Sequence, residues 1–266
     1  MLEGVSKTAL FTLRARAEEH GRADRRFADP DAVAWLEALG WPDELSKFYS
    51  AWIQAKTAIR TVQIDRMVRL CQERFEVTQI VELACGLSSR RQRLGFEGAW
   101  LDVDLPAVIA ARTSLGIEGS EQLAASALDL SWIDHVEVPD QTIVIAEGLV
   151  YYLPIEDVDA LFTKMRERIA GAVVVLDVIG ELDFDAAKRF SARLDAPIHW
   201  AVAPPFEAAM DAMGLDTIEG LEPDVVLDEA LSEIRGLLRP VLSTFARVGV
   251  FRDRRSGTMV GRLRAT

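Results

Sequence analysis

Between residues 79 and 178, short apolar segments that end in an acidic or small residue alternate with stretches of helical character. Apolar strands that alternate with helices form a parallel sheet whose two faces are both covered. We therefore predict an α/β fold built on a mostly parallel sheet. Its strands are expected at residues 79–83, 99–103, 123–128, 141–146 and 172–178.

The segments around these strands follow other patterns. Before them, apolar residues at helical spacing predict helices at residues 7–19, 29–39 and 51–75, and a strong helix is expected between the last two strands, at residues 154–170. After them, residues 205–213 and 229–238 are expected to be helical. Residues 243–252 and 258–264 are expected to be strands on either side of a Ser256-Gly257 turn, which suggests a closing antiparallel hairpin.

Composition excludes several classes of function. The formal net charge is −12, so a polyphosphate would be repelled and nucleic acid is not the expected partner. Cys71 and Cys85 form no CxxC pair, which favours a reducing cytoplasm, and neither a signal peptide nor a membrane span is expected. His20, His135 and His199 are scattered, so no bound metal is predicted. Nothing here predicts an oligomeric state.

Acidic and small residues gather where the predicted strands end. They are Glu82, Gly86, Asp102, Asp104, Asp129 and Glu147. In an open parallel sheet, ligands bind beyond the carboxyl ends of the strands. A small-residue turn lets a ligand approach the backbone, and an acid about 20 residues later can accept hydrogen bonds from ribose hydroxyls. Adenosine satisfies both requirements.

The turn distinguishes between two adenosine cofactors. A dinucleotide would need its pyrophosphate held by a GxGxxG turn, which this loop lacks. S-adenosylmethionine carries a sulfonium and an amino group, and both suit the nearby acids Glu82 and Glu147. The pattern favours S-adenosylmethionine, with a nucleotide-dependent oxidoreductase as the alternative. Structural roles also stay open, since Gly86 could form a tight turn and Asp102, Asp104 and Asp129 could cap helices or turns.

Several segments in order along the chain resemble the leucine carboxyl methyltransferase-like family, especially its bacterial branch of polyketide-type O-methyltransferases. They are residues 6–16 with Asp29-Pro30, residues 59–65, the loop 81–90, Asp102-Val103-Asp104-Leu105-Pro106, residues 146–153, and residues 246–249. The resemblance implies a Rossmann-like, seven-stranded class I methyltransferase sheet. It also implies a single domain, 1–266, with a helical cap (1–76), a cofactor-binding core (77–180), a lid insertion (181–240) and closing strands (241–266).

The resemblance also implies roles for single residues. Lys7 and Arg60 would hold the cofactor carboxylate, and Gly86 and Glu147 would line the methionine portion. Glu82 fits the general acid-x-Gly-x-Gly pattern with one Gly lost. Asp104, with Asp102 nearby, would take the ribose hydroxyls, and Asp129 and Leu130 would flank the adenine. The chain departs from the family at Ala84, where Gly is common, and at Ser88-Ser89-Arg90, where Asp-Thr-Arg is common. A Cβ at Ala84 is expected to crowd the backbone approach.

The expected activity is methyl transfer from S-adenosylmethionine to a hydroxyl or carboxylate of a small-molecule acceptor, leaving S-adenosylhomocysteine. An in-line displacement at the sulfonium depends mainly on alignment and desolvation. Tyr152 and His199 are the candidate bases if the acceptor is a phenol, and Tyr151 and Trp200 are the candidate acceptor contacts. The alternatives are a protein C-terminal carboxyl methyltransferase and an inactive member that binds the cofactor.

Overall fold

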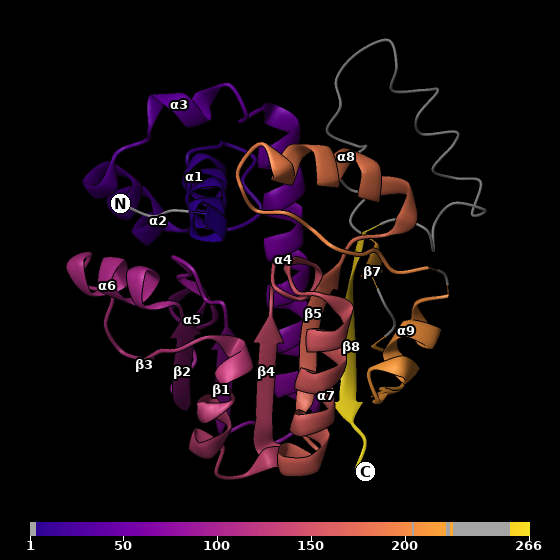
Figure 1. Ribbon diagram of the computed structural model, residues 1–266. Helices are drawn as coiled ribbons and strands as arrows, with labels where there is room; N and C mark the ends of the chain where they lie inside the picture. The colour runs from indigo at the N-terminus through magenta and orange to yellow at the C-terminus, as the bar shows by residue number, and fades with distance from the viewer. Residues whose placement is uncertain (1–3, 204, 222–223, 226–255) are drawn as a thin grey trace.

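The computed structural model describes residues 4–203, 205–221, 224–225 and 256–266. Its centre is one sheet (Figure 1) in the order β3-β2-β1-β4-β5-β8-β6, with β7 paired to β8. The strands are β1 Gln79–Leu83, β2 Ala99–Asp104, β3 Glu121–Ala124, β4 Thr142–Ala146, β5 Val173–Val178, β6 Leu215–Thr217, β7 Asp224–Val225 and β8 Gly257–Leu263.

The described helices occupy the remaining segments. They are α1 Thr8–His20, α2 Pro30–Leu39, α3 Asp43–Ser46, α4 Ala51–Arg74, α5 Arg90–Leu94, α6 Pro106–Ser114, α7 Ile155–Ile169, α8 Glu181–Ala192 and α9 Phe206–Ala212. The start of α2 follows from local chemistry, since the Asp29 side chain accepts the Ala32 N–H at 3.0 Å and Pro30 occupies the first turn. The predicted helical region before the first strand is confirmed. No described helix is both long and apolar enough to cross a bilayer.

Strands β1 to β5 pair in parallel, as predicted. Strand β8 runs the other way, between β5 and β6, and pairs antiparallel with both. Figure 1 shows β8 in yellow, pointing opposite to its neighbours. It corresponds to the predicted strand at residues 258–264. The predicted helix at 229–238 and strand at 243–252 lie outside the described residues.

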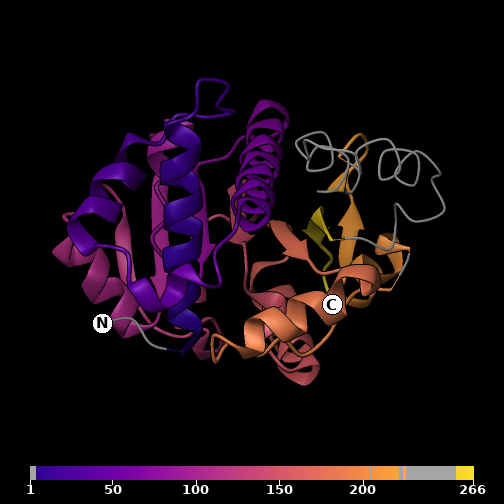
Figure 2. The ribbon, with the colours of Figure 1, turned by 90° about the horizontal axis from the view of Figure 1, so that it is seen from above.

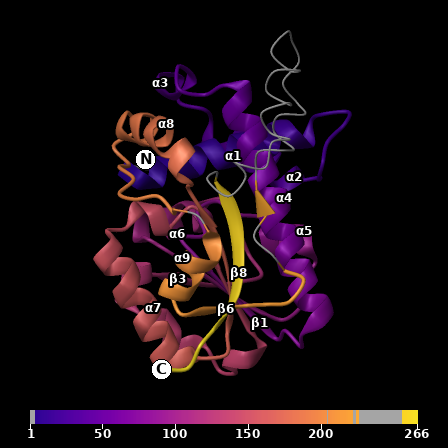
Figure 3. The same ribbon diagram turned by 90° about the vertical axis from the view of Figure 1, so that its right-hand side faces the viewer.

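Helices cover both faces of the sheet (Figure 3). On one face, Val81 and Leu83 of β1 pack in the core cluster that contains the apolar side of α7. On the other face, Ile80 packs with Ile64 and Val68 of α4. Successive side chains of a strand point to opposite faces, so one apolar strand serves both clusters.

The third predicted strand is displaced in the structure. Residues 123–128 were expected, but β3 ends at Ala124 and a 3-10 turn, Ala127–Asp129, follows. The Ser126 hydroxyl accepts the Leu128 N–H at 3.2 Å, which favours the turn over an extended strand. Because β3 ends earlier than predicted, the residues that follow its carboxyl end are 125–127 and not those after residue 128.

Helices α1 and α8 lie over the carboxyl ends of the strands, and α4 runs from that end down one face of the sheet (Figures 1 and 2). Helix α1 and the segment after α8 share a third core cluster, in which Leu10 and Leu13 are buried with Leu194 and Ala196. The ring of Phe11 meets the ring of Phe190 edge to face, with centroids 5.8 Å apart. The N-terminal helices and α8 therefore cover the end of the sheet where ligands bind.

Candidate active site

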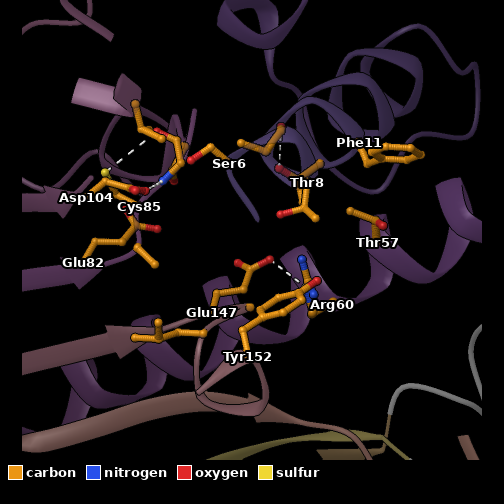
Figure 4. A pocket seen from close by; sticks show the side chains of 18 of the residues that line it. Ser6, Thr8, Phe11, Thr57, Arg60, Glu82, Cys85, Asp104, Glu147 and Tyr152 are labelled. Atoms are coloured by element: carbon orange, nitrogen blue, oxygen red, sulfur yellow. Dashed lines mark hydrogen bonds and ion pairs between the residues drawn. The ribbon is translucent and has the colours of Figure 1, made fainter. Parts of the chain in front are cut away.

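A cavity of about 340 Å³ lies at the carboxyl ends of β1 to β4, beneath α1, α4 and α8. Its wall on the sheet side is formed by the loop after β1, the end of β2, residues 125–127 and the loop after β4. The cavity is lined from the helices by Phe11, Ile53, Thr57 and Phe190, and from the segment after α8 by Leu194. Figure 4 shows Asp104 and Cys85 on one side of the cavity and Phe11 and Thr57 on the other.

The loop after β1 turns sharply into the cavity. Ala84 has φ of 51° and Gly86 has φ of 54°, a backbone conformation that favours glycine. The Gly86 N–H donates to Oδ2 of Asp104 at 2.7 Å, and the Leu105 N–H donates to Oδ1 of the same carboxylate at 2.7 Å. Burial raises the pKa of Asp104, and these backbone bonds oppose the shift. The first two strands thus present a fixed carboxylate beside the turn.

Arg60 of α4 lies beside the cavity wall that follows β4. Its Nε donates to Oε1 of Glu147 at 2.8 Å, and its Nη1 reaches Oη of Tyr151 at 3.1 Å and Oδ2 of Asp177 at 3.2 Å. Burial alone would raise the pKa of Glu147, but Arg60 and Arg90 outweigh it and lower this pKa to about 2. Glu147 is therefore ionised throughout the neutral range.

Arg90 of α5 extends this ion network. Its guanidinium pairs with Asp65 at 2.7 Å and also with Glu82 and Glu147. Burial raises the pKa of Glu82, and Arg90 opposes that shift. Asp65 and Asp177 complete the network and were not among the predicted site residues. Asp177 could have been found, because it stands at the end of a predicted strand like the acids that were chosen.

Arg60, Glu82, Gly86, Asp104, Glu147, Tyr151 and Tyr152 are the predicted site residues that line the cavity. The other six do not. Lys7 stands between two lining residues, Ser6 and Thr8, without lining the cavity itself. Asp102, predicted to lie near the ribose, does not line the cavity, because it lies two residues before the end of β2.

Asp102 is instead buried among protein groups. Its Oδ2 pairs with Arg112 and accepts the Ser120 hydroxyl, and its Oδ1 accepts the Trp100 indole N–H at 3.0 Å. Asp129 is exposed, and Leu130 packs against the core with φ of 65°. Because β3 ends early, residues 125–127 line the cavity where Asp129 and Leu130 were expected.

His199 and Trp200 lie outside the cavity and support the loop after β4. The backbone N–H of His199 donates to the Tyr151 carbonyl at 2.9 Å, and its side chain is exposed. The Trp200 indole N–H donates to the carbonyls of Val150 and Leu153 at 3.2 and 3.1 Å. Neither residue lines the cavity, so the structure does not bring His199 or Trp200 together with the other predicted site residues. Tyr152 does line the cavity, with its ring centroid 4.9 Å from that of Tyr151.

The described residues contain no cluster of His, Cys, Asp and Glu side chains that could hold a metal ion. The cavity has a carboxylate, a guanidinium and an apolar wall in which Leu105 and Val108 face it. Those groups match the ribose, carboxylate and adenine of the predicted cofactor in chemical character.

The chain is similar to known methyltransferases over most of its length. The family model described as leucine carboxyl methyltransferase matches residues 9–166. The tetracenomycin polyketide synthesis O-methyltransferase TcmP of Streptomyces glaucescens is 26% identical over 211 residues, which cover 77% of this chain and 77% of that protein. The S-adenosyl-L-methionine-dependent methyltransferase dpfgK of Gibberella zeae is 27% identical over 212 residues, which cover 71% and 68% of the two chains.

Solved structures share the fold. A duf574 family protein from Streptomyces avermitilis superposes with a TM-score of 0.59 at 15% identity, covering 91% of this chain and 100% of that one. The magnesium protoporphyrin IX methyltransferase of Synechocystis, solved with bound S-adenosylhomocysteine, gives 0.51 at 11% identity, covering 87% and 93%. The predicted class I, Rossmann-like methyltransferase fold is confirmed.

Proposed function

Because the chain belongs to the leucine carboxyl methyltransferase family and is an S-adenosylmethionine-dependent methyltransferase, we propose that it methylates an oxygen atom, the carboxylate oxygen of a small-molecule acceptor. The bound cofactor supplies an activated methyl group and leaves as S-adenosylhomocysteine. The protein has to align the acceptor and exclude water, which a covered cavity can do.

The cavity offers a partner for each polar part of the cofactor. Arg60 would attract the carboxylate of the methionine portion by its charge and bind it through Nη2, since Nε and Nη1 donate to Glu147, Tyr151 and Asp177. Asp104 would accept the ribose hydroxyls, and Gly86 and Glu147 would line the methionine chain. The adenine would lie against residues 125–127, in place of the predicted contacts.

The titratable side chains around the cavity support a carboxylate acceptor. Deprotonating a hydroxyl requires a free base. The pKa of Glu147 is about 2, and burial raises the pKa of Tyr152, which keeps its proton near neutral pH. The other two cavity acids are engaged, Glu82 with Arg90 and Asp104 with two backbone N–H groups. In the described part of the chain, no histidine lines the cavity. A carboxylate acceptor is already ionised near neutral pH and needs no base. The observation that carries the proposal is the engagement of Glu82 and Glu147 with Arg60 and Arg90.

The size of the cavity supports a small acceptor. Its volume of about 340 Å³ is near the lower end of the range for small-molecule sites. Phe190 of α8 and Leu194 after it add apolar side chains to the cavity wall. TcmP acts in polyketide synthesis by its name, which suits an aromatic acid as the first acceptor to test.

The direct test compares matched acceptors. Purified protein with S-adenosylmethionine would receive aromatic carboxylic acids, each paired with a phenol of the same size, and products would be identified by mass spectrometry. We expect methyl esters, which release methanol in mild alkali, whereas methyl ethers are stable. The rate should vary by less than about twofold between about pH 6.5 and 8.5, because the acceptor is already ionised. An alkali-stable product would contradict the proposal.

Two further outcomes identify the alternatives. The second panel compares a peptide that has a free C-terminal carboxylate with the same peptide amidated. Methylation of the free peptide alone, without turnover of the small acids, would indicate a protein carboxyl methyltransferase. Calorimetric binding of the cofactor without turnover on either panel would indicate an inactive member, the alternative that the departure at Ala84 suggests.

A further inference from the structure

Two buried arginines bind consecutive carbonyl oxygens of the cofactor loop, defined as residues 84–89. Arg112 of α6 donates through Nη1 to the carbonyls of Gly86 at 2.9 Å and Ser88 at 3.2 Å. Arg16 of α1 donates to the carbonyl between them, that of Leu87. We propose that Arg16 and Arg112, the arginine pair, are positioning residues that fix the cofactor loop for S-adenosylmethionine binding.

Each member of the arginine pair is itself fixed by a buried carboxylate. Arg16 is 4% exposed and pairs with Asp29 at 2.8 Å, while Arg112 is 2% exposed and pairs with Asp102. Asp29 is 1% exposed and Asp102 is 2% exposed. A guanidinium held in this way keeps its planar donors in one orientation, which a flexible ammonium does not. This geometry gives Asp102 a role through Arg112 rather than through the ribose.

The cofactor loop has a physical need for such support. Ala84 and Gly86 both have positive φ, and a non-glycine residue is strained there. Binding the carbonyls of residues 86, 87 and 88 fixes the three peptide planes that follow the turn. The Gly86 N–H can then stay on Asp104, the predicted ribose residue, at 2.7 Å. The arginine pair thus opposes relaxation of a strained turn at the cofactor wall.

Arg16 also joins the N-terminal helices to the cofactor loop. Its Nη1 donates to the Ser89 hydroxyl at 2.6 Å, and that hydroxyl donates to Oδ2 of Asp29 at 2.6 Å. The same aspartate caps α2. Arg93 reaches Asp29 at 3.1 Å and Ser89 at 2.7 Å, so Asp29 keeps a charged partner when Arg16 is shortened to lysine. A lysine variant at position 16 is therefore expected to fold.

The test measures S-adenosylhomocysteine affinity by calorimetry, which requires no acceptor and no turnover. Arg16→Lys and Arg112→Lys keep the positive charge but lose the planar guanidinium with its several N–H donors. Each should raise the Kd for S-adenosylhomocysteine about tenfold or more. The control is Arg14→Lys on α1, which makes the same substitution at an arginine that pairs with Glu18 and does not contact the cofactor loop, and it should leave the Kd within about twofold. All measurements are made below the ligand-free unfolding midpoint of each variant.

A double-variant cycle separates positioning from general destabilisation. If both arginines act on one loop, Arg16→Lys/Arg112→Lys should raise the Kd by clearly less than the product of the two single effects. Lower unfolding midpoints with Kd values within about twofold of the wild type would overturn the inference. If a lysine variant does not fold, Ser89→Ala is measured instead. It should raise the Kd about threefold or more, and an unchanged Kd would equally overturn the inference. A folded wild type that binds no S-adenosylhomocysteine would instead overturn the cofactor assignment on which the inference depends.

Discussion

Ala84 lies at a backbone position where an L-residue is strained. Its φ of 51° brings the Cβ close to the carbonyl oxygen, at a cost of roughly 1–2 kcal/mol that glycine does not carry. Replacing alanine by glycine usually destabilises a protein through the entropy of the unfolded chain, by roughly 0.4–1 kcal/mol. At this position the relief of strain offsets or exceeds that loss.

We therefore expect Ala84→Gly to raise the free energy of unfolding by up to about 1 kcal/mol in urea titrations. The matched control is Ala127→Gly, which also faces the cavity but lacks a positive φ, and it should lower the free energy of unfolding. Equal losses in the two variants would contradict the strain assigned to Ala84.

At the scale of residues, position along the strand separates the two predicted acids of β2. Gly86, Asp104 and Glu147 stand at or beyond the ends of their strands and line the cavity. Asp102 stands two residues earlier, and an arginine that sequence patterns did not single out neutralises it. The partners of buried charges come from distant elements, so a linear pattern could not identify Arg16 or Arg112 as contacts of the loop.

Among the elements, α8 contributes an aromatic side chain to the wall of the cavity in which the acceptor is proposed to bind. Phe190 lines the cavity, whereas Phe184 on the same helix packs against the main core cluster and Lys188. Both are phenylalanines on one helix, so their substitutions form a matched pair.

Phe190→Ala should enlarge the acceptor side and raise the kcat/KM ratio of a ring-extended acid over a single-ring acid by about tenfold, in the range of pocket discrimination. Competition assays read by mass spectrometry would measure this ratio. Phe184→Ala should leave the ratio within about twofold, and S-adenosylhomocysteine affinity should be nearly unchanged in both variants. A similar shift in the two variants would show that Phe190 does not limit acceptor size.

Burial also explains which elements could be predicted. Strand β1 has the predicted bounds, and all five residues of β4 are buried, which gives a clear apolar segment. Strand β3 is only partly buried, so its sequence carried a weaker signal and its predicted position was displaced toward residue 128. The position of β8 between β5 and β6 depends on pairing between segments far apart in the sequence, so local sequence patterns do not predict it.

Across the whole molecule, the ion network around Glu147 makes the free energy of unfolding depend on pH. It joins α4, α5, β1, β5 and the loop after β4. The folded pKa of Glu147, about 2, lies below its ordinary value of 4.5. Its contribution is therefore present above about pH 4.5 and is lost as the pH falls toward 2, and it amounts to roughly 3 kcal/mol.

Of that amount, about 2 kcal/mol should disappear between about pH 5.5 and pH 3. In urea titrations, the free energy of unfolding of Glu147→Gln should decline less over this interval than that of the wild type. The control is Glu167→Gln, which removes a surface acid paired with Lys164 on α7 and should follow the wild type. Parallel curves for wild type and Glu147→Gln would contradict the pKa assigned to Glu147.

The place of β8 in the sheet has a consequence for synthesis on the ribosome. Strand β5 is complete at Val178, but its antiparallel neighbour begins only at Gly257. At translation rates of about 5–20 residues per second, the intervening chain takes roughly 4–16 s to make. During that time the apolar strand Val173–Val178 has an edge that its final neighbour cannot yet cover, and such edges pair readily with other chains. Protecting this edge is a task for the nascent chain or for a chaperone, before any methyl group can be transferred.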